Sequence, residues 1–215
     1  MTSVDFPESE LLGEIYSQAL RAAGVPVRAE LGLGTREMVA PALQEGLVDV
    51  VPEYIGSALQ AFALPGAVDM SKPSAVATAL SAALVPWHAV VLSPSPAEDQ
   101  NGLVVSRALA DQYGLRSVSD PRPLATRLVL TGPPECKGRA YCLAGFRRTY
   151  GLEFRQFFAL DTANQRVSAL DQGVADVAVL FTTDAQLATG NLVLLRDDRH
   201  LQPAENIAPL ASERV

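Results

Sequence analysis

Residues 32–54 read GLGTREMVAPALQEGLVDVVPEY, and residues 159–181 read ALDTANQRVSALDQGVADVAVLF. The two stretches align without a gap when the chain is shifted against itself by 127 positions. Over the wider alignment of residues 21–58 with residues 148–185, 11 of the 38 pairs are identical. The sequence therefore predicts two copies of one structural unit.

Both copies carry the same order of local signals. Each reads as the end of a helix, a glycine, a short alternating strand, a threonine suited to cap a helix, an amphipathic helix, a second glycine and a buried apolar strand. The paired landmarks are Gly24 and Gly151, Thr35 and Thr162, and Gly46 and Gly173. Alternating strands and helices are typical of an α/β fold in which helices flank a largely parallel sheet, so we expect two similar α/β lobes.

The apolar strands of the two copies end at equivalent aromatic residues, Tyr54 and Phe181. Ligands of parallel sheets bind outside the carboxyl ends of the strands, so this pair is a candidate binding site facing a cleft. Burial of both rings in the core is the alternative. The strand expected over residues 125–132 would have its counterpart before Ser3, which predicts that the first strand of copy one is absent or cut short and that the chain is trimmed at its N-terminus.

Composition and charge exclude several classes of protein. Apolar residues make up 48% of the 215 residues, which is enough for a packed core. The formal net charge of −7 argues against nucleic-acid binding, which requires a basic surface. No apolar run reaches the length of about 18 residues that a membrane span needs. The acidic start MTSVDFPESELLGEIY does not resemble a signal peptide.

No catalytic or metal-binding signature is present. The sequence lacks the glycine-rich phosphate loops, the HExxH zinc motif and the GxSxG nucleophile motif. Two cysteines are too few for a four-ligand zinc site, and the two histidines stand far apart. We therefore expect neither enzymatic activity nor a metal or other cofactor.

Several segments in fixed order resemble the substrate-binding proteins of ABC transporters for glycine betaine, choline and related osmoprotectants. The segment GLGTREMVAPALQEGLVDVVPEYIGSAL resembles a family pattern that ends in PEYTGT. The other segments that match, in chain order, are FPESELLG, LTGPPECKGRAYCLAGFRRTYGLEF, ALDQGVADVAVLFTTDAQLA and LVLLRDDRHLQPAENIAPL. The resemblance extends over nearly the whole chain.

The resemblance implies the bilobed, type II periplasmic-binding-protein architecture, in which two α/β lobes joined by two crossings close around a small solute. We expect the crossings near residues 93–100 and 195–206. Lobe one would comprise residues 1–96 and 197–215, and lobe two residues 97–196. The family normally continues beyond NIAPL, so the chain is expected to be trimmed at both termini.

The resemblance also implies candidate ligand-binding residues. Tyr54 stands at the cage tyrosine of the family's PEY motif, Ser57 at the hydroxyl residue three positions later, and Arg139 at the arginine that binds the ligand's carboxylate. Aromatic faces suit a quaternary ammonium, and an arginine suits a carboxylate. The alternative for Arg139 is a surface arginine in a loop. Thr183 lies in the turn that follows Phe181, and Asp184 is expected to orient its neighbours there.

The sequence departs from the family at three cage positions. Asn101 and Glu205 stand where the family has tyrosines, and Asp5 lies beside Val4, which replaces a lysine. These changes predict a more acidic pocket with more hydrogen-bonding groups. We therefore expect a cationic or zwitterionic ligand that carries N–H or O–H donors, rather than glycine betaine itself.

The cysteines fit this family context. Cys136 and Cys142 bracket Arg139, and a disulfide between them would close a small loop and fix the approach of the arginine. Such a bond suits an exported protein, and two reduced thiols are the alternative.

The function implied is an extracytoplasmic solute receptor that delivers its ligand to the permease subunits of an ABC importer. A ligand-sensing domain of a regulator or receptor with the same fold is the alternative. We expect a periplasmic or cell-surface location, with no nucleic-acid partner and with membrane association only through a partner or an anchor outside this chain.

Overall fold

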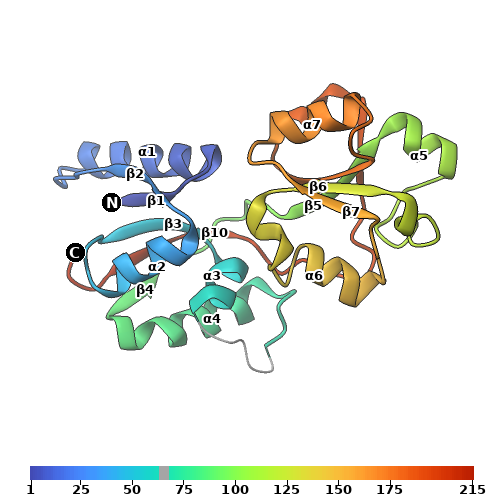
Figure 1. Ribbon diagram of the computed structural model, residues 1–215. Helices are drawn as coiled ribbons and strands as arrows, with labels where there is room; N and C mark the ends of the chain where they lie inside the picture. The colour runs from blue at the N-terminus through green and yellow to red at the C-terminus, as the bar shows by residue number, and fades with distance from the viewer. Residues whose placement is uncertain (63–67) are drawn as a thin grey trace. The chain divides into compact units, whose positions relative to one another are not determined.

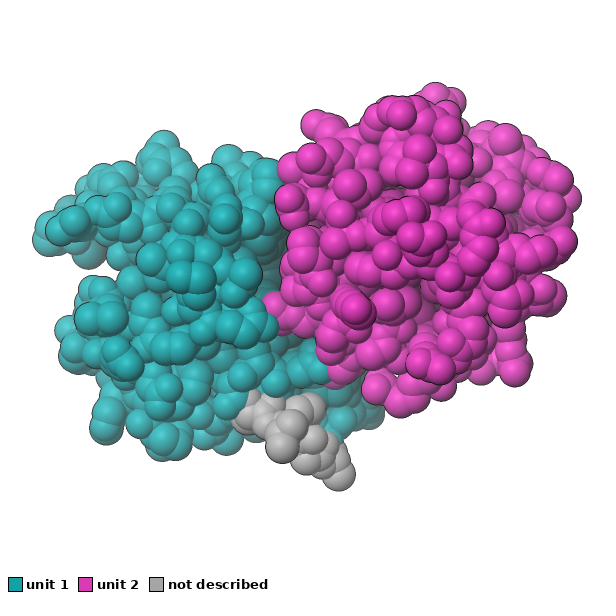
Figure 2. Space-filling model, viewed as in Figure 1, with its two compact units in different colours: residues 1–98, 204–215 teal, residues 99–203 magenta. Residues whose placement is uncertain are grey.

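The computed structural model describes residues 1–62 and 68–215. These residues form two compact units, unit 1 with residues 1–98 and 204–215 and unit 2 with residues 99–203, which Figure 2 shows in separate colours. In the described part of the chain, no helix combines the length and the hydropathy needed to cross a membrane.

Unit 1 contains two sheets and four helices among its described residues (Figure 1). Strands β1 and β2 pair in parallel, and strands β3, β10 and β4 form a sheet in that order. The elements are β1 (Thr2–Val4), α1 (Pro7–Ala22), β2 (Glu30–Gly34), α2 (Arg36–Gln44), β3 (Val50–Tyr54), α3 (Ile55–Phe62), α4 (Pro73–Leu84), β4 (Ala89–Val91) and β10 (Ile207–Ser212).

Unit 2 contains one sheet with the strand order β7-β6-β8-β5-β9. A π-helical turn (Phe146–Tyr150) continues α6, and a 3-10 turn (Pro134–Lys137) follows β6. The elements are β5 (Asn101–Ser106), α5 (Arg107–Tyr113), β6 (Val129–Gly132), α6 (Leu143–Gly145), β7 (Gln156–Ala159), α7 (Ala163–Asp171), β8 (Val177–Phe181) and β9 (Leu192–Leu195).

The predicted α/β class is confirmed, and the internal repeat is visible in the element boundaries. Helices α2 and α7 begin and end 127 residues apart, as do strands β3 and β8. Gly46 and Gly173 both adopt left-handed backbone conformations, with φ of 69° and 66°, directly after the residues that cap these helices. Glycine tolerates this conformation because it has no Cβ. The two helix–strand segments therefore end and turn in the same way.

The expected largely parallel sheets are corrected, because one strand in each main sheet is reversed. Strand β5 runs antiparallel to β8 and β9, and β10 runs antiparallel to β3 and β4. Each of these two strands is the first that follows the passage of the chain from one unit into the other. They do not follow a helical crossover within their own sheet, which is the connection that parallel neighbours require.

Two expected strand positions were wrong. The first strand of copy one is present as β1, which pairs with β2 as β6 pairs with β7. The mistake arose because residues 125–127 form a 3-10 turn, so the strand expected from residue 125 begins only at Val129. The short alternating strand of copy one, predicted from VPVRAEL at residues 25–31, begins only at Glu30. Pro26 precedes it and cannot donate a ladder hydrogen bond.

The sheet of unit 2 separates two apolar cores. Successive residues of β8 point to opposite faces, as in any strand. Val177 and Val179 pack in one core with Phe146 and Tyr150, whereas Ala178 and Leu180 pack in the other core with α7. Figure 1 shows α6 and α7 on opposite sides of this sheet. Strand β8, which carries Phe181 at its carboxyl end, is thus packed on both faces of the sheet.

Candidate functional site

The carboxyl end of β3 in unit 1 carries Tyr54. The Tyr54 ring is buried and packs on Phe6, with 5.9 Å between ring centroids. Its hydroxyl donates a hydrogen bond of 2.5 Å to Glu8 Oε1. Because Phe6 caps α1 and Glu8 lies in the first turn of that helix, the start of α1 fixes the orientation of the tyrosine.

A buried ion pair lies directly before Tyr54. Arg36 Nε donates to both oxygens of Glu53, at 3.0 and 2.9 Å, and Glu53 also accepts the Tyr54 N–H at 3.2 Å. Burial opposes the positive charge of Arg36, but Glu53 and Glu205 outweigh this effect and raise the pKa of Arg36 above its usual value. This pair was not predicted from the sequence. A signal was available, because the repeat places apolar residues, Ala163 and Leu180, at the equivalent positions.

Glu205 and Ser57, both predicted site residues, contact each other in unit 1. Ser57 Oγ donates to Glu205 Oε1 at 2.6 Å, and Ser57 N donates to Oε2 at 2.9 Å. Burial raises the pKa of Glu205 to about 7, although the Ser57 hydrogen bonds and Arg36 act in the opposite direction. Both carboxylate oxygens therefore hold the first turn of α3, and Glu205 is an internal contact of unit 1.

Asp5, the remaining predicted site residue of unit 1, lies one residue beyond β1. Its side chain is exposed, and its backbone N–H donates to Gly34 O at 2.9 Å. Unit 1 thus brings Tyr54, Ser57 and Glu205 together around one strand end, with Asp5 following another strand.

In unit 2, three predicted residues gather where β8 ends. Asn101, the first residue of β5, pairs with Phe181, the last residue of β8. Thr183 follows in an exposed turn, where its N–H and the Thr182 hydroxyl both donate to Asp99 Oδ1, at 3.3 and 3.2 Å. Asp184 Oδ2 accepts the Phe181 N–H at 2.8 Å. Two carboxylates, of which the sequence analysis missed Asp99, therefore fix the turn.

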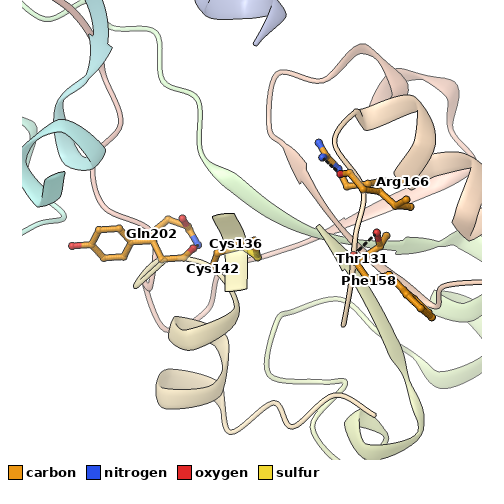
Figure 3. Close-up of a disulfide and its surroundings, with 8 residues drawn as sticks. Thr131, Cys136, Cys142, Phe158, Arg166 and Gln202 are labelled. Atoms are coloured by element: carbon orange, nitrogen blue, oxygen red, sulfur yellow. Dashed lines mark hydrogen bonds between the residues drawn. A yellow bond between two sulfur atoms is a disulfide. The ribbon is translucent and has the colours of Figure 1, made fainter. Parts of the chain in front are cut away.

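Arg139 lies on a separate loop of unit 2 that follows β6. Cys136 and Cys142 form a disulfide across this loop, and both are buried (Figure 3). The Arg139 N–H donates to Cys136 O at 3.3 Å, and Arg139 O accepts the Cys142 N–H at 3.1 Å. Gln202 Nε2 donates to Tyr141 O at 3.0 Å and holds the far side of the loop.

No metal centre is apparent in the described residues, 1–62 and 68–215, because no three His, Cys, Asp or Glu side chains group as ligands there. The polar groups at both strand ends instead donate and accept hydrogen bonds or carry charge. Such groups can bind a small polar or charged solute.

Comparison with known proteins gives a consistent result. The glycine betaine-binding protein YehZ of Escherichia coli K12 is 28% identical over 97% of this chain and 72% of its own length. The glycine-betaine-binding protein of Pseudomonas aeruginosa is 28% identical over 98% of this chain and 70% of its own.

A solved structure described as a glycine betaine/carnitine/choline ABC transporter shares the fold. It is 21% identical, has a TM-score of 0.74 and covers 99% of this chain, which in turn covers 79% of it. The family model for the substrate-binding domain of ABC-type glycine betaine transport systems matches residues 1–215. The chain therefore belongs to this family of substrate-binding domains.

Proposed function

We propose that this protein captures a small cationic or zwitterionic solute, of quaternary-ammonium or amino-acid-like type, and delivers it to an ABC importer without chemical turnover. The observation that carries the proposal is the match of the family model to the whole chain, residues 1–215. In this role the protein acts outside the cytoplasm, in the periplasm or at the cell surface, with the importer's permease subunits as its partners.

Each unit contributes its own residues to binding in this proposal. Tyr54 and Ser57 contribute from unit 1, together with Asp5 and, through Ser57, Glu205. From unit 2, Phe181 contributes an aromatic face, Asn101 and Thr183 contribute hydrogen bonds, and Arg139 binds the carboxylate of a zwitterion. The disulfide supports the role of Arg139, because it anchors the loop at both sides of that residue.

The acidic character of unit 1 supports a ligand with hydrogen-bond donors. Glu53 and Glu205 are buried and engaged by Arg36 and Ser57, whereas the carboxylates of Asp5, which is exposed, and Glu8, which is half-buried, lie nearer the surface. A trimethylated ammonium cannot donate to these oxygens, whereas an N–H or O–H group can. The proposal therefore favours donor-bearing solutes over glycine betaine.

A panel of solutes tests the ligand class. Wild-type protein is heated with glycine betaine, choline, carnitine, arginine and a neutral sugar, and the melting temperature is recorded. We expect the cations and zwitterions that carry donors to raise it most. Tight binding of glycine betaine without any response to amino-acid-like cations would refute the donor requirement, and a response to the sugar alone would refute the function.

Arg139→Ala tests the residue assignment by calorimetric titration. Loss of a charge-assisted hydrogen bond should lower the affinity for a zwitterion by about 10-fold or more. The affinity for choline, which lacks a carboxylate, should be nearly unchanged. Arg155→Ala serves as the control, because Arg155 is an exposed arginine of the same unit. Equal weakening of both ligands by Arg139→Ala would contradict the assigned role.

The alternative function, a sensing domain of a regulator, has weaker support. The family model describes a transport component, and the relatives compared above are named as binding proteins. A sensing domain predicts a signalling or DNA-binding segment in the same polypeptide, so the sequence of the intact gene product separates the two functions.

A further inference from the structure

A glutamine near the end of unit 2 carries a buried acceptor without a partner. Gln202 is 7% exposed, and its side-chain oxygen Oε1 makes no hydrogen bond within the described residues, 1–62 and 68–215. Its Nε2 donates to Tyr141 O at 3.0 Å. Because the Tyr141 carbonyl can pair only with a donor, the amide nitrogen must face it and the amide oxygen must face away. The unpaired oxygen therefore does not result from a reversed amide.

The backbone of Gln202 is fixed within unit 2 as well. Its N–H donates to Asp197 Oδ2 at 2.8 Å, and the Leu201 N–H donates to Asp197 Oδ1 at 3.0 Å. The hydroxyl of the buried Tyr150 donates to the same Oδ1. Asp197 thus ties this segment to the apolar core that contains Tyr150 and Leu201. A side chain held at its backbone and at its amide nitrogen presents Oε1 in one direction.

The amide of Gln202 supports the loop that carries Arg139. Tyr141, whose carbonyl it holds, comes two residues after Arg139 and directly before Cys142 of the disulfide (Figure 3). A buried acceptor without a donor is costly, and in native proteins an ordered water or a ligand usually supplies the missing hydrogen bond. The unpaired oxygen therefore lies next to the loop that the proposed function brings to the solute.

The chemistry of the proposed solutes identifies a donor that suits this oxygen. Cationic and zwitterionic amines carry their charge on nitrogen, and a hydrogen bond from a charged N–H is about twice as strong as one between neutral groups. A primary, secondary or tertiary ammonium has at least one such N–H. A quaternary ammonium has none, so it would leave Oε1 unpaired.

We infer that Gln202 Oε1 accepts a hydrogen bond from the ammonium N–H of the solute, and that Gln202 thereby selects incompletely methylated amines over quaternary ones. This inference rests on the proposed function and names the substrate class within it. Gln202 is a specificity-determining residue in this account. Its oxygen contacts the solute, while its nitrogen supports the loop of Arg139.

Calorimetric titration with two matched pairs of solutes at neutral pH tests the inference. Dimethylglycine and glycine betaine are zwitterions, and protonated dimethylethanolamine and choline are cations; within each pair, one N–H is replaced by N-methyl. The wild type should bind the N–H member of each pair about 10-fold more tightly, since the quaternary member leaves a buried acceptor unpaired. Gln202→Met removes the acceptor at similar size and should reduce this preference to about 2-fold or less.

Gln202→Glu separates contact with the solute from support of the loop. The carboxylate keeps an acceptor at this position but cannot donate to Tyr141 O, so the preference for the N–H members should remain. If Gln202 acted only by supporting the loop, Gln202→Met and Gln202→Glu would both lose the preference. Gln172→Met is the matched control, because Gln172 is an exposed glutamine of the same unit, and it should keep the wild-type preference.

The ratio of affinities within a pair separates selection from stability, because a loss of structure weakens both members together. Equal affinities in the wild type would show that water, and not the solute, pairs with Oε1, and would overturn the inference alone. A preference that survives in Gln202→Met, or is lost in Gln202→Glu, would overturn it too. If Gln202→Met does not fold, the wild type and Gln202→Glu decide the matter.

The same titrations distinguish this inference from the function on which it rests. A wild-type protein that binds no member of either pair overturns the inference. The proposed function fails with it when no other cation or zwitterion of the solute panel binds either.

Discussion

The two copies of the repeat share a backbone but differ in what they bury at the end of the apolar strand. In unit 1, Arg36 and Glu53 form a buried ion pair. In unit 2, the equivalent residues are Ala163 and Leu180, and Leu180 packs in an apolar core. Both residues of the ion pair are replaced together by apolar residues in unit 2. This is expected because a single buried charge without its partner is far more costly than either the ion pair or the apolar pair. The comparison indicates that the charges in unit 1 are not needed to form this helix and strand.

The largest effect is expected when this pair is broken. Glu53→Leu leaves Arg36 buried without its partner and should lower the free energy of unfolding by about 3–5 kcal/mol. The double variant Arg36→Ala/Glu53→Leu reproduces unit 2 and should recover at least half of the loss. Urea unfolding followed by Trp87 fluorescence reports on unit 1, since Trp87 is the single tryptophan. A double variant less stable than Glu53→Leu would contradict the comparison.

The next effect is a pH dependence that comes from Glu205. Its pKa of about 7 in the folded protein exceeds the ordinary value of 4.5, so folding favours the protonated form. Its contribution to stability is fully present below about pH 4.5 and is lost as the pH rises through 7, with a total of about 3 kcal/mol at 1.4 kcal/mol per pKa unit.

Glu205→Gln isolates this contribution from those of other acids. Between pH 5 and 8, the stability of Glu205→Gln should fall less than that of the wild type. Glu45→Gln, which changes an exposed glutamate, should keep the wild-type profile. Identical profiles for Glu205→Gln and the wild type would show that Glu205 does not titrate in this range.

The disulfide is a further difference between the copies, because Cys136 and Cys142 correspond to Ser9 and Ile15 of unit 1. Replacing both cysteines by serine should lower stability by about 2 kcal/mol, the loop-closure contribution of so short a loop. The loss of stability is measured by circular dichroism during urea unfolding, with the disulfide-bonded wild type as the reference. If the disulfide also fixes Arg139, zwitterion affinity falls in the folded variant. An unchanged affinity would limit the bond to a structural role.

The smallest effect concerns the caps of α2 and α7. Thr162 accepts the Gln165 N–H at 3.2 Å, and the Gln165 side chain accepts the Thr162 N–H at 3.0 Å, which completes a capping box. Thr35 makes no side-chain cap bond. Thr162→Ala should therefore lower the free energy of unfolding by about 1 kcal/mol, and Thr35→Ala should lower it clearly less. Thermal unfolding of the two variants measures the difference. Equal losses would indicate that the capping box does not contribute.

Much of the fold could be predicted from the sequence, because the repeat and the helix-capping residues are local signals. The threonine and glycine landmarks placed α2, α7, β3 and β8 correctly. The direction of β5 and β10 could not be predicted, since it depends on how the chain enters each sheet. The position of β1 was predicted wrongly because the strand of copy two was expected to begin at residue 125, whereas residues 125–127 form a 3-10 turn before β6.

The sequence was less informative about the site. Tyr54, Ser57 and Glu205 were chosen from family positions, and the structure places Ser57, three residues beyond Tyr54 at the end of β3, in contact with Glu205 within unit 1. The hydrogen bonds from Ser57 to both oxygens of Glu205 could not be predicted, because that contact joins residues 148 positions apart. Arg36 and Glu53 were missed, since a charged residue in an amphipathic segment resembles a solvated one. The signal that could have identified these residues is the comparison of the two copies, position by position.

Native mass spectrometry of the protein, purified without denaturation, tests the central claim most directly. The account predicts a bound small molecule that is released on unfolding and proves to be a cationic or zwitterionic amine. Protein stripped by unfolding and refolding should capture the same class of molecule from a cell extract. Release of an anion or a neutral sugar, or failure of the refolded protein to capture any cation or zwitterion, would contradict the account.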